Sequence, residues 1–223
     1  MYKLVINMKT YEEATDKKAI KIAKACQKLS KQAKKRNVEI ILCPQPTDLK
    51  EIAKTKITTF SQHFDPLEAG AHTGYILPHA LTTAGAKGSL ISHSEHILPI
   101  PEIEKRILTA NAHNLKTIVC ARDEYIAERI SMLKIKPDYI AVEPKELIGG
   151  DISISTAKPS LITRSLAACG NIPLLVGAGV KTTKDVQKSI ELGAKGILVA
   201  SGVDKAKDVV KAIKELLEGF PKK

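Results

Sequence analysis

Cysteine pairs and metal-binding spacings are missing from this 223-residue chain. The four cysteines lie far apart, with no C-x-x-C pair, which argues against a zinc ribbon, a thioredoxin-type redox site and a disulfide scaffold. The six histidines show neither an H-x₃₋₅-H nor an HExxH spacing. His93 and His96 are three residues apart, but Glu95 between them does not complete a known metal motif. We therefore expect no metal and no cofactor.

Long apolar runs are also missing. No run of eighteen apolar residues occurs, so no membrane-spanning helix is expected. The first residues, MYKLVINMKTYEE, reach polar and acidic side chains too early for a secretory signal. The sequence therefore predicts a cytoplasmic protein with no membrane partner.

Aromatic residues are few, with three Phe, five Tyr and no Trp, while the net charge is +11. Excess positive charge raises nucleic acid as a partner. However, no aromatic side chain alternates with the basic ones to stack on bases. Many of the charges fall in one stretch with helical apolar spacing, which indicates the solvated outer face of a helix and no nucleic-acid partner. These basic residues are Lys17, Lys18, Lys21, Lys24, Lys28, Lys31, Lys34, Lys35 and Arg36.

Short apolar segments alternate with helical patterns along the whole chain. Segments typical of strands occur at residues 3–7, 39–43, 57–61, 88–92, 116–120, 139–142, 174–176 and 196–199. Segments typical of helices occur at residues 17–36, 48–54, 78–86, 101–112, 123–133, 159–168, 183–192 and 205–217. The strand segments are continuously apolar, as in strands that helices cover on the far side of a parallel sheet.

The ends of several predicted helices carry residues that adopt left-handed backbone conformations. Asn37, Gly85, Gly170 and Gly193 stand where C-caps are expected. Eight strand–helix pairs without a break in composition predict a single α/β domain over residues 1–223. A closed eight-stranded (β/α)8 barrel with parallel strands inside a ring of helices fits this count better than an open sheet, which the count alone does not exclude.

Polar residues that could take part in catalysis follow the predicted strands. Lys9, His93 and Glu143 each lie at a strand's C-terminal end, and small-residue turns occupy residues 177–179 and 200–202. Each has an ordinary explanation by itself, because lysines are usually solvated and tight turns need glycine anyway. In a barrel, however, all of them converge on one mouth, which is where barrel enzymes place their active sites.

The turns after the seventh and eighth strands are where barrels commonly bind phosphate, through backbone N–H groups and a short helix N-terminus. An acid, an imidazole and a lysine beside a phosphate site predict proton transfer on a sugar phosphate. A metal-dependent phosphosugar epimerase would need ligands that the sequence does not offer. A basic barrel that only binds nucleic acid remains an alternative with nothing but the charge behind it.

The chain resembles the triosephosphate isomerase family over nearly its full length, and is most similar to the short archaeal form. The HSE and AVEP motifs, in this strand order, are specific to that family. The matching segments are Asn7-Met8-Lys9, His93-Ser94-Glu95, Cys120, Ala141-Val142-Glu143-Pro144, Leu147-Ile148-Gly149, Ser155 to Pro159, Gly177-Ala178-Gly179 and Leu198 to Gly202. The resemblance implies a TIM barrel that interconverts dihydroxyacetone phosphate and glyceraldehyde 3-phosphate in glycolysis and gluconeogenesis.

The resemblance also implies roles for individual residues. Glu143 would be the base, His93 a neutral electrophile, and Lys9 a fixed positive charge, in a mechanism for which this family is the standard worked example. We expected a helix N-terminus beside His93 to favour the neutral ring. Glu95 would support Lys9 and His93 or cap a helix. The other implied contacts are Asn7, Met8, Ile148, Gly149, Gly179, Ala200 and Ser201 for the substrate, with Ser94 beside Glu95 in support.

Two loops complete the expectation. Residues 144–150 would form a lid over the site, although Gly150-Asp151 departs from the family's usual hinge. Residues 62–75 would form the loop between subunits, which implies a homo-oligomer. A tetramer is expected if the chain follows the archaeal form, and otherwise a dimer.

Overall fold

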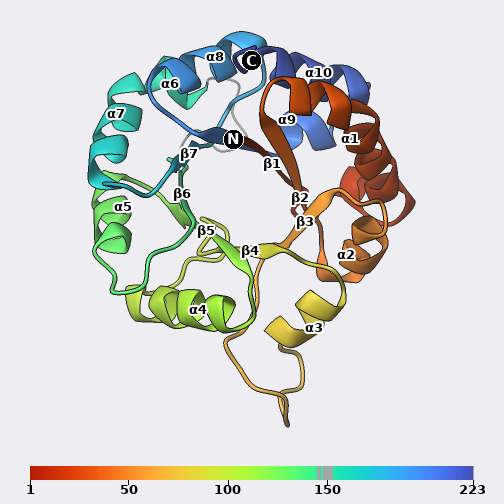
Figure 1. The fold of residues 1–223 in the computed structure, drawn as a ribbon, viewed down its shortest axis with the longest axis vertical. Coiled ribbons are helices and arrows are strands. Elements are labelled where there is room, and N and C mark those ends of the chain that lie inside the picture. Colours follow the sequence, from red (N-terminus) through yellow and green to blue (C-terminus); the bar gives the residue numbers. More distant parts are fainter. Residues whose placement is uncertain (145–146, 148–152, 223) are drawn as a thin grey trace.

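The computed structural model describes residues 1–144, 147 and 153–222 as a closed barrel of eight parallel strands inside a ring of helices (Figure 1). The predicted (β/α)8 fold is therefore confirmed. The strands follow one another around the barrel in chain order. They are β1 (Tyr2–Asn7), β2 (Val38–Cys43), β3 (Thr58–Ser61), β4 (Gly88–Ile91), β5 (Lys116–Ala121), β6 (Tyr139–Val142), β7 (Leu174–Val176) and β8 (Gly196–Val199).

A major helix follows each strand on the outside of the barrel (Figure 1). These helices are α1 (Lys17–Lys35), α2 (Pro46–Ala53), α3 (Pro78–Thr83), α4 (Ile100–Ala112), α5 (Glu124–Ser131), α7 (Pro159–Ala168), α8 (Thr183–Glu191) and α10 (Val209–Glu218). Among the described residues, one-turn helices also lie near the C-terminal ends of strands. They are η1 (Glu12–Ala14), α6 (Ile154–Ala157) and α9 (Ser201–Asp204).

Helix α1 shows how the sequence builds the outer ring. Ile22, Cys26 and Leu29 recur at helical spacing and are buried against the barrel, while the lysines of the same helix point to solvent. The basic stretch is thus an exposed helix face, as predicted. The exposed lysines are Lys17, Lys18, Lys21, Lys24, Lys28, Lys31, Lys34 and Lys35.

The buried side chains form two layers, one inside the barrel and one between the strands and the helices. Two cysteines, Cys43 and Cys120, belong to the interior layer, whereas Cys26 and Cys169 belong to the outer one. All four thiols are free and buried. Burial on both faces explains why the strands read as continuous apolar runs.

The predicted C-caps are confirmed. Asn37, Gly85, Gly170 and Gly193 all have positive φ, at 56°, 103°, 57° and 104°. These conformations end α1, α3, α7 and α8, because a left-handed residue cannot continue a right-handed helix.

Two helix predictions were wrong in their boundaries. The helix predicted over 205–217 begins only at Val209, because the Asp208 side chain accepts a hydrogen bond from the backbone N–H of Lys211 and starts α10 there, while the separate helix α9 ends before the predicted range. The helix predicted over 78–86 ends at Thr83, because Gly85 turns the chain toward β4. One-turn helices such as α6 and α9 have too few residues to show a period.

No helix within the described part of the chain is long and apolar enough to cross a membrane.

Closure of the barrel depends on a glycine. A Cβ at Gly196, at the start of β8, would overlap the backbone of Lys3 in β1. Gly196→Ala should therefore lower the free energy of unfolding by about 1–3 kcal/mol, the usual cost of overpacking. Urea denaturation measures this. Gly70→Ala is the matched control, because a Cβ there lies 3.5 Å from the nearest side-chain atom. Equal stability of the two variants would contradict this account of closure.

Candidate active site

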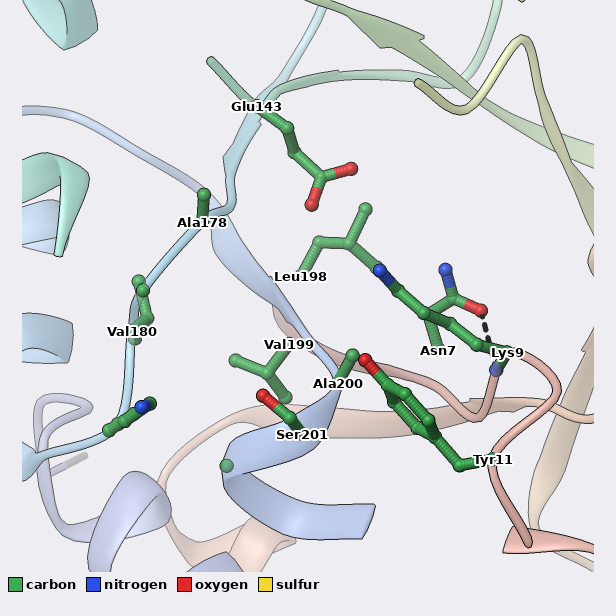
Figure 2. Close-up of a pocket in the computed structure, with 13 residues that line it drawn as sticks. Asn7, Lys9, Tyr11, Glu143, Ala178, Val180, Leu198, Val199, Ala200 and Ser201 are labelled. Carbon is green, nitrogen blue, oxygen red and sulfur yellow. Dashed lines mark hydrogen bonds between the residues drawn. The ribbon is translucent and has the colours of Figure 1, made fainter. Parts of the chain in front are cut away.

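A pocket opens at the C-terminal ends of β1, β6, β7 and β8 (Figure 2). Figure 2 shows the side chains of Lys9 and Glu143 reaching into it from opposite sides. Four separate strands thus place their following residues at one mouth, as the barrel predicts. The lining residues are Asn7, Lys9, Tyr11, Glu143, Ala178, Gly179, Val180, Lys181, Leu198, Val199, Ala200, Ser201 and Gly202.

Lys9 is held in an unusual backbone conformation. Its φ is 48°, in the left-handed region that a lysine seldom adopts. The Asn7 side-chain oxygen accepts a hydrogen bond from the Lys9 backbone N–H at 3.1 Å. The Gln62 amide donates to the carbonyl oxygens of Lys9, at 2.8 Å, and Cys43, at 2.9 Å. These bonds hold a strained residue, which is common at functional sites.

A line of polar contacts joins Lys9 to the imidazole of His93. The Lys9 ammonium lies 2.7 Å from Glu95 Oε1, and Glu95 Oε2 lies 3.6 Å from His93 Nδ1. Lys9 and His93 are buried, whereas the Glu95 side chain is 56% exposed. A charge pair with one exposed partner contributes little to stability. Its effect is to orient the lysine.

The hydrogen bonds of His93 define its tautomer. The backbone N–H of Glu95 donates to His93 Nδ1 at 3.2 Å, so Nδ1 carries a lone pair and the proton of a neutral ring is on Nε2. The expected helix N-terminus beside His93 was wrong, because α4 begins only at Ile100. Glu95 therefore lies in a turn and caps no helix.

Glu143 follows β6 directly and is 7% exposed. Its Oε2 lies 3.3 Å from His93 Nε2 and has no hydrogen-bond partner among the described residues. The carboxylate therefore lies next to the imidazole proton with lone pairs that remain available to accept a proton. This pairing of an open acceptor with a donor is the chemical core of the site.

Gly177 makes room for this carboxylate. A Cβ at position 177 would come within 2.6 Å of both Cγ and Oε1 of Glu143. The Gly177 backbone N–H also donates to Val142 O at 3.0 Å, which holds β7 beside β6. Gly177, the first glycine of the Gly-Ala-Gly turn, thus leaves space for the Glu143 carboxylate. The second, Gly179, has a φ of 70° that suits a tight turn.

The opposite wall of the pocket comes from the turn after β8. Ala200 precedes α9, and its carbonyl accepts from the N–H groups of Val203 and Asp204 at 2.9 and 3.0 Å. Ala200, Ser201 and Gly179 lie together in the pocket, as the resemblance implied.

Other expected contacts lie elsewhere. Met8 is fully buried in the layer between barrel and helices, so its side chain does not line the pocket. Ile148 and Gly149 lie outside the described residues, as does most of the expected lid at 144–150. Ser94 lines a neighbouring apolar hollow that also reaches Glu143.

Sequence reasoning missed three residues near this site. Tyr11 and Lys181 line the pocket, and Gln62 supports the Lys9 backbone. Tyr11 follows Lys9 closely and is one of only five tyrosines, which was an available signal. Gln62 begins the loop after β3, and no sequence pattern connects it to Lys9.

Cys120 lies behind Glu143 inside the barrel. Burial, followed by the charge of Glu143, raises the pKa of this thiol well above its usual range. The thiol therefore stays neutral and packs as a small apolar group.

A closed parallel barrel with an acid, an imidazole and a lysine at its mouth defines a barrel enzyme suited to moving protons on an anionic substrate. The sequence model of the family described as Triosephosphate isomerase matches residues 3–216.

Archaeal proteins of that name are similar to this chain. The triosephosphate isomerase of Methanothermus fervidus is 39% identical over 219 residues, which cover 96% of each chain. That of Methanocaldococcus jannaschii is 40% identical over 220 residues, covering 96% of this chain and 98% of the relative. That of Methanococcoides burtonii is 39% identical over 199 residues, covering 87% and 88%. The chain therefore belongs to the triosephosphate isomerase family, a family of aldose–ketose isomerases.

Gly177→Ala tests whether the glycine positions the acid. The added methyl group should displace the Glu143 carboxylate and lower kcat about 100-fold, the cost of misplacing a reacting group by about 1 Å. Steady-state kinetics measure the loss, and circular dichroism checks the fold. Gly70→Ala is the control for a Gly→Ala change far from the pocket. Unchanged kcat in Gly177→Ala would show that the acid tolerates the crowding.

Proposed function

We propose that this protein interconverts dihydroxyacetone phosphate and D-glyceraldehyde 3-phosphate through an enediolate, with residues 1–223 acting as one catalytic domain. The observation that carries the proposal is the 3.3 Å contact between Glu143 Oε2 and His93 Nε2, where an open acceptor meets a ring whose proton is on that nitrogen. Family membership favours this isomerase over the other phosphosugar barrels that the strand-end residues left open.

Glu143 is the general base. It removes a proton from C1 of dihydroxyacetone phosphate, and the released electron pair forms the C1–C2 double bond while the carbonyl pair moves to O2. Return of the proton to C2 gives the aldehyde, while one hydroxyl proton passes from O1 to O2. The buried position of Glu143 keeps its proton from exchanging freely with water.

His93 and Lys9 stabilise the charge that develops on the substrate oxygen. The Nε2–H of His93 donates a hydrogen bond to that oxygen. A neutral ring makes this bond without bringing an extra proton into the reaction. Lys9, oriented by Glu95, supplies fixed positive charge for the enediolate and the phosphate. Asn7 contacts the substrate and, with Gln62, keeps Lys9 in its strained conformation.

The phosphate binds to backbone N–H groups near Gly179, Ala200 and Ser201, with the backbone near Ile148 and Gly149 as further contacts. Support comes from the pocket lining, which includes Gly179, and from the turn after β8, whose Ala200 and Ser201 line the same pocket (Figure 2). Residues 144–150 form the lid. Within it, Leu147 N donates to Pro144 O, and beyond its C-terminal end Ile154 N donates to Ala178 O.

The proposed reaction uses side chains alone, without metal or cofactor, and takes place in the cytoplasm as a step of glycolysis and gluconeogenesis. Neither nucleic acid nor a membrane takes part. The lysines of α1 lie on a helix face without aromatic side chains for stacking.

The protein assembles as a homo-oligomer, a tetramer if it follows the archaeal form and otherwise a dimer. The segment between β3 and α3 projects beyond the ring of helices (Figure 1), and Tyr75 on it is 59% exposed. The hollow that Lys9 and His93 line is also lined by Gln62, His63 and His96. A projecting segment and an open hollow on one barrel suit an isologous contact between two copies.

Glu143→Asp tests the base. Shortening the side chain by one methylene withdraws the carboxylate from C1 and should lower kcat about 100-fold or more. A coupled assay with glyceraldehyde 3-phosphate measures this. Glu128→Asp, on the exposed side of α5, is the matched control and should retain the parent rate. Equal rates for Glu143→Asp and the parent would refute the role of Glu143, and an inactive parent would refute the proposed reaction.

Tyr75→Asp tests the oligomer. A charge at the tip of the projecting segment should shift the solution mass from a multiple of the 24.2 kDa chain to the single chain. Size-exclusion chromatography with light scattering measures the mass. Tyr75→Phe should keep the oligomer. A monomeric parent protein would disprove the assembly.

A further inference from the structure

Asp204 is a buried acid for which the mechanism above has no use. It is the last residue of α9, is only 2% exposed, and has two carboxyl oxygens without a hydrogen-bond partner among the described residues. Buried carboxyl groups are normally hydrogen bonded or paired, because an unpaired charge away from water costs several kcal/mol. This exception lies one helical turn from Ser201, which lines the pocket.

Within the described part of the chain, the charged groups that act on Asp204 are Lys9, from the loop after β1, and Glu13, from η1. The thiols of Cys26 in α1 and Cys43 at the end of β2 are also within electrostatic range. Burial raises the pKa of both thiols, so they remain neutral. Lys9 is therefore the positive charge that an ionised Asp204 would attract, and the same Lys9 lines the phosphate pocket.

The carboxyl group changes its charge in an accessible pH range. Burial raises the pKa of Asp204 to about 8, with Lys9 lowering it and Glu13 raising it to a lesser extent. At neutral pH the group is therefore mostly protonated and uncharged. Above about pH 8 it becomes an anion one helical turn from Ser201, on the same side of the barrel as the pocket.

We propose that Asp204 is a proton-binding site coupled to the phosphate pocket. In its neutral form it leaves the charge of Lys9 to the bound dianion, and in its ionised form it competes for that charge. Because coupling between two sites is reciprocal, a dianion that enters the pocket favours protonation of Asp204 and is bound together with a proton. The inference rests on the proposed function for placing the dianion there. Asp204 acts through Lys9 and touches no substrate atom, so it is a positioning residue.

Sulfate is the probe, because its double negative charge is constant across this pH range. Isothermal titration calorimetry of sulfate from about pH 7 to about pH 9.5 should show affinity that falls about tenfold, within the usual range for coupled sites. Asp204→Asn keeps the shape of the side chain and removes the titration, so its affinity should stay constant over the same range. A fall of equal size in Asp204→Asn would overturn the proposal, as would constant affinity in the parent protein.

Asp208→Asn is the matched control. Asp208 is an exposed acid four residues further on, and asparagine caps a helix as well as aspartate does. This variant should show the same fall in sulfate affinity as the parent. Constant affinity in Asp208→Asn would assign the effect to general surface charge and overturn the role of Asp204.

Two measurements on the parent protein keep the proposal testable if Asp204→Asn does not fold. Sulfate binding near pH 8.5, in two buffers with different ionisation enthalpies, should reveal proton uptake of up to one proton per site. Steady-state kinetics should show KM rising above about pH 8 while kcat changes less. Zero proton uptake, or a KM independent of pH, would overturn the coupling. Isomerase activity of the same sample tests the proposed function separately.

Stability offers a further check with a defined sign. Because the folded chain binds the Asp204 proton more tightly than the unfolded chain, the stability from this group is present below about pH 4 and is lost as pH rises through about 8. The melting temperature of Asp204→Asn should therefore fall less than that of the parent over this range. Identical pH profiles would contradict the buried, neutral state of Asp204.

Discussion

The hydrogen bonding of β1 to β8 is the constraint on which the rest of the molecule depends. It pairs Lys3 with Gly196 and Ile6 with Val199, and so closes the sheet into a barrel. Closure brings the ends of β1 and β8 together, and with them Lys9 and the turn at Ala200. An open sheet with the same strands would leave these residues at opposite edges. Backbone pairing between β1 and β8 therefore brings the pocket-lining residues together, and the side chains then complete the pocket.

Within that frame, the site depends on the cost of burying charge. Lys9 and Glu143 are both nearly excluded from water, and each has a polar neighbour close to its buried polar group. Glu95 pairs with Lys9, while His93 Nε2 lies 3.3 Å from Glu143 Oε2. The two charges are therefore held ready in fixed positions, and a substrate that enters replaces water with oriented dipoles.

The sequence predicted all eight strands, because segments buried on both faces leave an unbroken apolar pattern. It also placed Lys9, His93 and Glu143 at or just beyond the ends of strands, where the structure has them after β1, β4 and β6. It did not predict how they are held. Gln62 acts on Lys9 across 53 residues of chain, and no local pattern records such a contact.

The same limit applies to α9 and to the environment of His93. One turn of helix is too short to show a period, so the segment that buries Asp204 was not expected. A helix N-terminus was expected beside His93, but its Nδ1 accepts instead from one backbone N–H in a turn, a contact that no sequence pattern records. Local sequence thus determines which elements form, while the contacts between distant loops require the fold.

The four cysteines are distributed so that their reactivity reports which layer of the molecule has opened. Cys43 and Cys120 lie inside the barrel, and Cys26 and Cys169 lie beneath the helices. A buried thiol reacts with an oxidant or alkylating reagent only when its surroundings open. Loosening of the outer helices would expose the second pair while the first stays protected, whereas loss of the barrel would expose all four. Chemical damage to this protein should therefore follow the order in which its layers separate.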